Sequence, residues 1–195
     1  DKEGYEVTTY RVDGDYEDGR HPKQVMFTSS LEEDLKRRDF TINAMAYHPE
    51  RGLVDLFHGM EDMEHKIVRC VGDPMERFHE DALRILRAVR FSAQLGFTID
   101  DETKKGICAL SPNLKCVSAE RIQTELVKLL VSPHPDYLRV AYETGITREF
   151  LPEFDACMET AQNTPHHCYT VGEHILHSLL LVRQDKVLRL TMLLH

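Results

Sequence analysis

Hydrophobic residues recur at helical spacing between residues 79 and 97, in the most regularly patterned stretch of the chain. The repeated apolar positions are Ala82, Ile85, Leu86, Val89 and Ala93. This spacing places them on one face of an α-helix. Gly96 can end the helix in a left-handed conformation. The pattern therefore predicts one continuous amphipathic helix whose apolar face packs on a core.

The opposite face of this expected helix carries charged side chains, namely Asp81, Arg84, Arg87 and Arg90. At about 100° per residue they fan across the side away from the core, with Asp81 and Arg90 at its edges. An aspartate one turn before an arginine offers an acceptor beside a planar set of donors, which suits the edge of a nucleic-acid base. The further arginines suit phosphates. The alternative is an ordinary exposed face with an Asp81–Arg84 ion pair, and this helix alone favours it.

The remaining pattern predicts strands near the start of the chain and helices after it. Strands are expected at residues 5–12, 25–27, 53–57 and 67–71, where β-branched and aromatic residues gather. Helices are expected after the capping residue Ser30, at residues 60–65, from Pro74 into the patterned stretch, and at 98–110, 118–130, 136–145, 147–150, 171–182 and 186–195. Pro152 is expected to end the short helices before it. Because strands stop near residue 71, we predict an α+β head followed by an all-helical body.

A dense polar cluster interrupts the otherwise apolar segment at residues 35–47. It contains Arg37, Arg38, Asp39, Thr41 and Asn43. Buried charges need partners. Two interpretations remain open, a structural network of salt bridges or a site that binds a ribose and a triphosphate.

The composition is that of an ordinary globular protein. The chain has 195 residues, 42% of them hydrophobic, and no apolar run long enough to span a membrane. The net charge of −9 argues against a uniformly basic surface that coats nucleic acid, but arginines concentrate between residues 69 and 90 and allow a local basic groove. Five cysteines without a CxxC pair indicate reduced thiols and a cytoplasmic protein.

Both ends of the sequence suggest an interior fragment of a longer protein. The first residue is Asp1 rather than methionine, and a strand-like segment follows at once. His195 closes an apolar helical segment without a cap. We therefore expect the protein to continue on both sides.

Four motifs together resemble the class II nucleotidyltransferases, the family of CCA-adding tRNA nucleotidyltransferases and bacterial poly(A) polymerases. They are Arg-Arg-Asp-Phe-Thr-Ile-Asn-Ala at residues 37–44, Asp55 with Gly59 and Asp62, Glu-Asp-Ala-Leu-Arg at residues 80–84, and Glu-Arg-Ile-Gln-Thr-Glu at residues 120–125. Four motifs in the family's order are a more specific signal than any one of them. The resemblance implies the C-terminal part of a nucleotidyltransferase head at residues 1–72, a helical neck with a nucleotide-selecting helix at 73–132, and a helical body at 133–195.

The resemblance also implies roles for individual residues. Arg38 is expected to meet the phosphates of the nucleotide, with Asp39 and Asn43 near the ribose. Asp81 and Arg84 are expected to form an amino-acid template that selects ATP or CTP. Further expected contacts are Arg87 and Arg90 at the triphosphate, Glu6 as a carboxylate of the catalytic sheet, Arg11 as a phosphate contact and Arg37 in support. Glu120, Arg121 and Glu125 are expected to brace the selecting helix.

The implied activity is template-independent addition of CMP and AMP to the 3′ end of tRNA, from CTP and ATP and with Mg²⁺. An A-adding enzyme, a poly(A) polymerase and a non-catalytic nucleotide-binding module remain alternatives. The sequence departs from the family because the Gly-Gly phosphate loop and the Asp-x-Asp metal ligands that the resemblance implies would lie before Asp1. Phosphoryl transfer with two metals needs carboxylates that hold both ions. We therefore expect these 195 residues alone to be inactive.

Residues 162–195 resemble the start of an HD-type metal-binding domain. His174 matches the first metal ligand of that family and His195 the first residue of its His-Asp pair. Two histidines give an incomplete site, so packed or capping histidines are favoured over a metal site. Metal-dependent phosphohydrolysis by this part is a third possible function.

Overall fold

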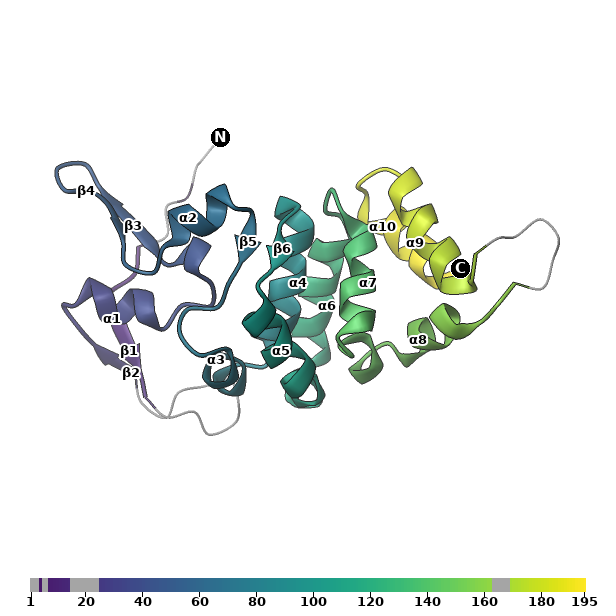
Figure 1. Ribbon diagram of the computed structural model, residues 1–195, viewed down its shortest axis with the longest axis horizontal. Helices are drawn as coiled ribbons and strands as arrows, with labels where there is room; N and C mark the ends of the chain where they lie inside the picture. Colours follow the sequence, from purple (N-terminus) through teal and green to yellow (C-terminus); the bar gives the residue numbers. More distant parts are fainter. Residues whose placement is uncertain (1–3, 5–6, 15–24, 163–168) are drawn as a thin grey trace.

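A computed structural model shows an elongated molecule whose parts follow one another along its long axis (Figure 1). It describes residues 4, 7–14, 25–162 and 169–195. The strands β1–β4 gather at one end with α1 and α2, the helices α3–α7 form the middle, and α8–α10 form the other end. The expected α+β class with a helical body is therefore confirmed.

The strands in the described part of the chain form three short pairs. Antiparallel pairs join β1 (Arg11–Asp13) to β2 (Val25–Phe27) and β3 (Met45–His48) to β4 (Gly52–Asp55). A parallel pair joins β5 (Ile67–Val68) to β6 (Thr98–Ile99). The β5–β6 pair ties the end of the head to the helical part, so strands do not stop near residue 71 as expected.

Helices account for most of the rest. In the head these are α1 (Leu31–Lys36), the 3₁₀ turn η1 (Thr41–Asn43) and α2 (Gly59–Glu64). The middle contains α3 (Pro74–Glu80), α4 (Leu83–Leu95), α5 (Asp101–Leu110), η2 (Ser111–Cys116), α6 (Ala119–Leu130), η3 (Pro135–Tyr137), α7 (Leu138–Glu143) and η4 (Thr147–Glu149). The last three are α8 (Pro152–Glu159), α9 (Val171–Leu181) and α10 (Lys186–Leu194). Among the described residues, no helix has the length and apolar character that crossing a membrane requires.

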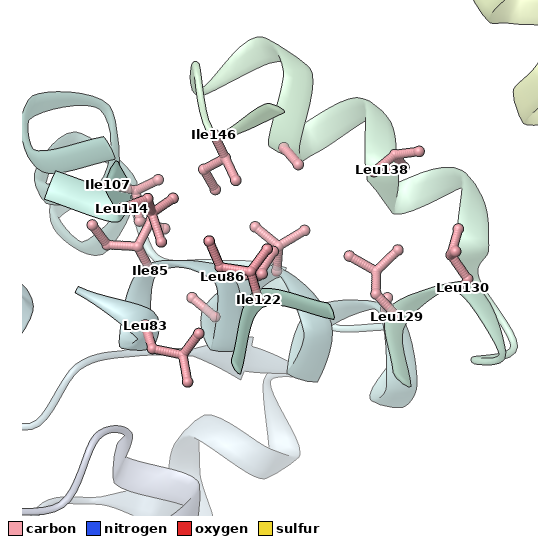
Figure 2. Close-up of a cluster of buried hydrophobic side chains, with 14 of the residues drawn as sticks. Leu83, Ile85, Leu86, Ile107, Leu114, Ile122, Leu129, Leu130, Leu138 and Ile146 are labelled. Carbon is pink, nitrogen blue, oxygen red and sulfur yellow. The ribbon is translucent and has the colours of Figure 1, made fainter. Parts of the chain in front are cut away.

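Helix α4 lies at the centre of the main core. All five apolar positions that the pattern placed on its inner face are buried, namely Ala82, Ile85, Leu86, Val89 and Ala93. Figure 2 shows side chains from α4 facing Ile107 of α5, Ile122 and Leu129 of α6 and Leu138 of α7. Gly96 ends the helix with a φ of 66°, the left-handed cap that the sequence predicts. One helix therefore connects the packing of the middle part to the surface that it shares with the head.

The expected continuous helix over residues 79–97 is wrong at one point. Helix α3 ends at Glu80, and Asp81 takes an extended conformation with φ −145° and ψ 102° before α4 starts at Leu83. The Asp81 carboxylate accepts a hydrogen bond from the Leu83 N–H at 3.1 Å. This is the local bond by which aspartates compete with helical backbone bonds. Asp81 therefore lies beside the first turn of α4 instead of on its outer face.

Two further expectations are corrected. The strand expected at residues 5–12 is found at Arg11–Asp13, and residues 7–10 lie outside any strand. Pro152 begins α8 instead of ending a helix, because proline fits the first turn, where its missing N–H has no helical partner. By contrast, Ser30 caps α1 as expected and accepts from the Glu33 N–H at 3.3 Å.

Leu86→Ala should lower the free energy of unfolding by about 3 kcal/mol, because it leaves a cavity at a fully buried position of α4. Leu95→Ala on the same helix is the matched control, since that side chain is 47% exposed and should cost less than about 1 kcal/mol. Urea denaturation of the purified variants measures both. Equal losses at the two positions would contradict the central place of α4 in the core.

Candidate nucleotide-binding cleft

The polar cluster after α1 and the charged edge of α4 face each other across a cleft of about 990 Å³. The described residues that line it are Thr8, Thr9, Arg11, Phe27, Arg37, Arg38, Asp39, Asn43, Asp81, Leu83, Arg84, Arg87, Phe91 and Arg121. Six of these are arginines and two are aspartates, so the cleft has a positive excess that suits a polyphosphate. Two segments that the sequence analysis singled out separately thus form one site.

Asp34 organises the arginines on the head side of the cleft. Its carboxylate is buried and accepts from Arg37 Nη2 at 2.5 Å, from Arg38 Nη2 at 3.3 Å and from the Arg11 N–H at 3.3 Å. Burial by itself raises the pKa of Asp34, but these hydrogen bonds and the charge of Arg37 outweigh it and lower the pKa below its usual value. The carboxylate therefore stays charged and holds the neighbouring arginines in place.

Asp39 joins the head to helix α4. One carboxylate oxygen accepts from Arg87 Nε at 2.8 Å and from Arg87 Nη2 at 2.6 Å. The other accepts from the Phe40 N–H at 2.9 Å and from Asn43 Nδ2 at 3.1 Å. Asp39 is 8% exposed, so its charge is buried together with its partners. The predicted ribose pair and one predicted phosphate residue thus share one hydrogen-bond network.

Asp81 is held from two sides at the break between α3 and α4. Besides the bond from Leu83, it accepts from Arg121 Nη2 at 2.8 Å. Arg121 comes from α6, which packs against α4. Arg121 thus links α6 to the break before α4, and it also lines the cleft.

Arg84 lies three residues further on, and its guanidinium spans from α3 to the head. Nη1 donates to Glu80 Oε2 at 2.5 Å and to the Arg77 carbonyl at 3.1 Å, while Nη2 donates to the Arg37 carbonyl at 2.9 Å. Arg84 and Asp81 both line the cleft, so the structure brings the predicted template pair together at its wall.

Arg90 does not lie where the sequence placed it. It is 6% exposed, is absent from the described lining of the cleft, and donates from Nε to Glu125 Oε2 at 2.8 Å. Its guanidinium carbon also lies 3.4 Å from the centroid of the Phe91 ring. Burial lowers the pKa of Arg90, and the carboxylate of Glu125 opposes that shift. This arginine links α4 to α6 and does not line the cleft.

The remaining predicted residues lie in the cleft, on α6 or outside the described part of the chain. Arg11 lines the cleft, and its carbonyl accepts from Arg37 Nε at 3.2 Å. Glu125 contacts α4 through Arg90, whereas Glu120 is exposed on the first turn of α6. Glu6 lies outside the described residues, so its expected place in the catalytic sheet stays a prediction.

The two histidines at the far end of the chain come together away from the cleft. The ring centroids of His174 and His195 are 5.5 Å apart, and His195 Nδ1 lies 2.7 Å from the Met192 carbonyl oxygen. Among the described residues, no three His, Cys, Asp or Glu side chains gather as a metal site would require. In the cleft, Asp39 and Asp81 each pair with an arginine, and no other described carboxylate lines it.

The sequence analysis did not single out Asp34, Arg77 or Glu80 as separate site residues. Asp34 has a detectable signal, because a carboxylate at i−3 and i−4 from two arginines forms ion pairs in a helix. The contacts of Arg77 to the head depend on tertiary structure and have no such signal. Phe91, which also lines the cleft, looks like any aromatic residue of an amphipathic helix.

Two family descriptions match separate parts of the chain. The poly(A) polymerase head domain matches residues 1–69, and the probable RNA and SrmB-binding site of polymerase A matches residues 96–158. Curated relatives include CCA-adding enzymes of Pediococcus pentosaceus, 48% identical over 85% of this chain and 42% of the relative, and of Bacillus licheniformis, 51% identical over 80% of this chain and 40% of the relative. The chain thus spans less than half the length of these relatives.

Solved structures agree with these matches. A Bacillus stearothermophilus CCA-adding enzyme in complex with CTP superposes with a TM-score of 0.67 and 33% identity over 97% of this chain and 47% of that one. A Thermotoga maritima CCA-adding enzyme complexed with tRNA superposes with a TM-score of 0.59 and 27% identity over 84% of this chain and 44% of that one. The resemblance to the class II nucleotidyltransferases is thereby confirmed. Within that class, these relatives and solved structures are CCA-adding enzymes.

Asp34→Asn should lower the free energy of unfolding by about 2 kcal/mol at neutral pH, because it removes the charge of a carboxylate that accepts hydrogen bonds from two arginines. The folded-state pKa of Asp34 lies below its usual value. Its contribution is therefore present above the unfolded pKa and is lost as the pH falls through the folded value. Urea denaturation at neutral pH and at about pH 3 measures the free energy of unfolding of both proteins. The difference between Asp34→Asn and wild type should be smaller in acid.

The control for this prediction is Glu32→Gln, on an exposed side chain of the same helix. It should change the free energy of unfolding by less than about 0.5 kcal/mol at neutral pH. If the difference in free energy of unfolding between Asp34→Asn and wild type stayed constant down to acid pH, the charge of Asp34 would not be what stabilises the fold.

Proposed function

We propose that the protein to which this chain belongs adds CMP and AMP to the 3′ end of tRNA, completing the CCA sequence. The observation that carries this proposal is the cleft, in which Asp81 and Arg84 on one wall face Arg38, Asp39 and Asn43 on the other. A carboxylate acceptor and a guanidinium donor fork can read the edge of a base without a nucleic-acid template. The relatives named as CCA-adding enzymes support this assignment.

The proposed binding mode assigns the base to the wall with Asp81 and Arg84. The ribose would lie against Asp39 and Asn43, and the triphosphate would lie among the remaining arginines. Those arginines can bind phosphate oxygens through paired hydrogen bonds, which favours a polyanion over a neutral ligand. Binding would also exchange some protein ion pairs for contacts with the nucleotide, because Asp39 already pairs with Arg87.

The proposed reaction needs Mg²⁺, which the family uses to activate the attacking hydroxyl and to hold the leaving pyrophosphate. The described residues offer no group of carboxylates for it. We therefore propose that the metal ligands come from other parts of the protein, and that residues 1–195 alone bind nucleotides without transferring them. We also propose a division into a head at 1–72, a neck at 73–132 and a body at 133–195, and the match of the head domain to residues 1–69 supports the first part.

We also propose a cytoplasmic location. The supporting observation is that the described cysteines are free, namely Cys70, Cys108, Cys116 and Cys157. Burial raises the pKa of the Cys70 thiol to about 12, so it stays protonated and inert. Reduced thiols of this kind are typical of intracellular proteins.

The decisive experiment uses the full-length protein with Mg²⁺ on tRNAs that end before CCA, after C and after CC. Products are read at single-nucleotide resolution with CTP alone, ATP alone and both. Addition of CCA followed by a stop supports the proposal. Addition of A to the CC substrate only indicates an A-adding enzyme, and a long A tail indicates a poly(A) polymerase. No extension of any substrate would favour a non-catalytic nucleotide-binding module.

Asp81→Asn in the full-length protein should reduce discrimination of CTP and ATP against UTP and GTP by about tenfold to a hundredfold in kcat/KM. The estimate follows from the worth of one good base contact, about 1–3 kcal/mol. Asparagine keeps the oxygen that accepts from Leu83 but removes the charge that pairs with Arg121. Steady-state kinetics with each nucleotide separately measures the ratio.

The matched control is Asp185→Asn, because Asp185 also accepts backbone N–H groups at a helix start, at Val187 and Leu188. It lies outside the described lining of the cleft and should leave the ratio unchanged. If Asp81→Asn weakened all four nucleotides equally, the residue would serve the structure and not the selection.

A further inference from the structure

We propose that Arg77 is a positioning residue for nucleotide selection, acting through Glu80 on Arg84. This inference rests on the proposed function and deepens it. Arg77 belongs to α3 and is absent from the described lining of the cleft. It therefore acts by holding another side chain and not by touching the nucleotide.

Glu80 lies between two guanidiniums. Its Oε1 accepts from Arg77 Nη2 at 2.5 Å, and its Oε2 accepts from Arg84 Nη1 at 2.5 Å. The three side chains are 14%, 22% and 11% exposed in the order Arg77, Glu80 and Arg84. Water therefore screens these ion pairs much less than it screens pairs on an open surface. Oε1 thus pairs with an arginine before the break between α3 and α4, and Oε2 pairs with an arginine after it.

The same two arginines rest on consecutive carbonyls of the head. Arg77 Nη1 donates to the Lys36 carbonyl at 3.3 Å, and Arg84 Nη2 donates to the Arg37 carbonyl at 2.9 Å. Lys36 is the last residue of α1, directly before the Arg-Arg-Asp segment that lines the cleft. Arg77 thus fixes Glu80 relative to the head as well as relative to α4.

Loss of Arg77 would leave Oε1 of Glu80 without its partner. The carboxylate could then turn and take both donor groups of Arg84, since paired hydrogen bonds from arginine to a carboxylate are favourable. That movement would draw the Arg84 guanidinium toward α3 and away from the base. Lysine could not replace Arg77 fully, because one ammonium lacks the planar fork that reaches a carboxylate and a carbonyl together.

The test measures dissociation constants of CTP, ATP, UTP and GTP for the full-length protein by calorimetry, in wild type and Arg77→Met. We expect the preference for CTP and ATP over UTP and GTP to fall about tenfold, as for the partial loss of a base contact. The affinities for UTP and GTP should move by less than about twofold, because the arginines that meet the phosphates are retained. Arg77→Lys should keep an intermediate preference.

Two comparisons make the test specific. Arg139→Met is the matched control, because Arg139 forms a similar ion pair with Glu173 between α7 and α9, and it should leave the preference unchanged. In a protein that already carries Glu80→Gln, Arg77→Met should cause no further loss of preference, since both changes break the same link.

An equal loss of affinity for all four nucleotides, or an additive loss in the double variant, would overturn the inference. If wild type prefers CTP and ATP and the Arg77→Met variant keeps the same preference, the inference is overturned while the proposed function stays intact. A wild type that binds the four nucleotides alike would overturn the proposed function and this inference with it.

Discussion

The ion pair between Asp39 and Arg87 connects the two halves of the cleft. Asp39 follows α1 in the head, whereas Arg87 projects from α4, whose other face is buried in the main core. A buried carboxylate requires a partner, and here that partner fixes the distance between the head and the helix. The wall with Asp81 and Arg84 and the wall with Arg38, Asp39 and Asn43 are therefore held at a fixed separation.

Around this pair, carboxylates outside the described lining of the cleft hold three of its other arginines. Asp34 holds two arginines of the head, Glu80 holds Arg84, and Glu125 holds Arg90 behind the helix. The arginines are consequently oriented before a ligand arrives, which reduces the side-chain entropy that binding must overcome. A preorganised cleft of this kind can discriminate between ligands by geometry, which a flexible cluster of cations cannot do.

The amino-acid pattern predicted the α+β class, the inner face of α4 and its glycine cap, because these depend on local periodicity and backbone preference. The motifs also singled out several residues that meet in the cleft, among them Arg38, Asp39, Asp81 and Arg84. The break at Asp81 was missed, because a side chain that bonds to the backbone competes with a helix whose apolar pattern continues across it. Arg90 was misplaced for another reason. The helical pattern puts it at the edge of the polar face, but its partner Glu125 lies 35 residues away in the sequence, and no local pattern predicts that contact.

The long sequence separations within the cleft have a consequence for the order of folding. Arg84 reaches a carbonyl 47 residues away, and Arg87 reaches a carboxylate 48 residues away. Contacts of such separation form only after the chain between them has been closed into a loop, at a cost in entropy. The cleft therefore forms late, when the head docks on the helices. A ligand that binds only the docked state would add its binding free energy to that last step and would thereby help to complete the fold.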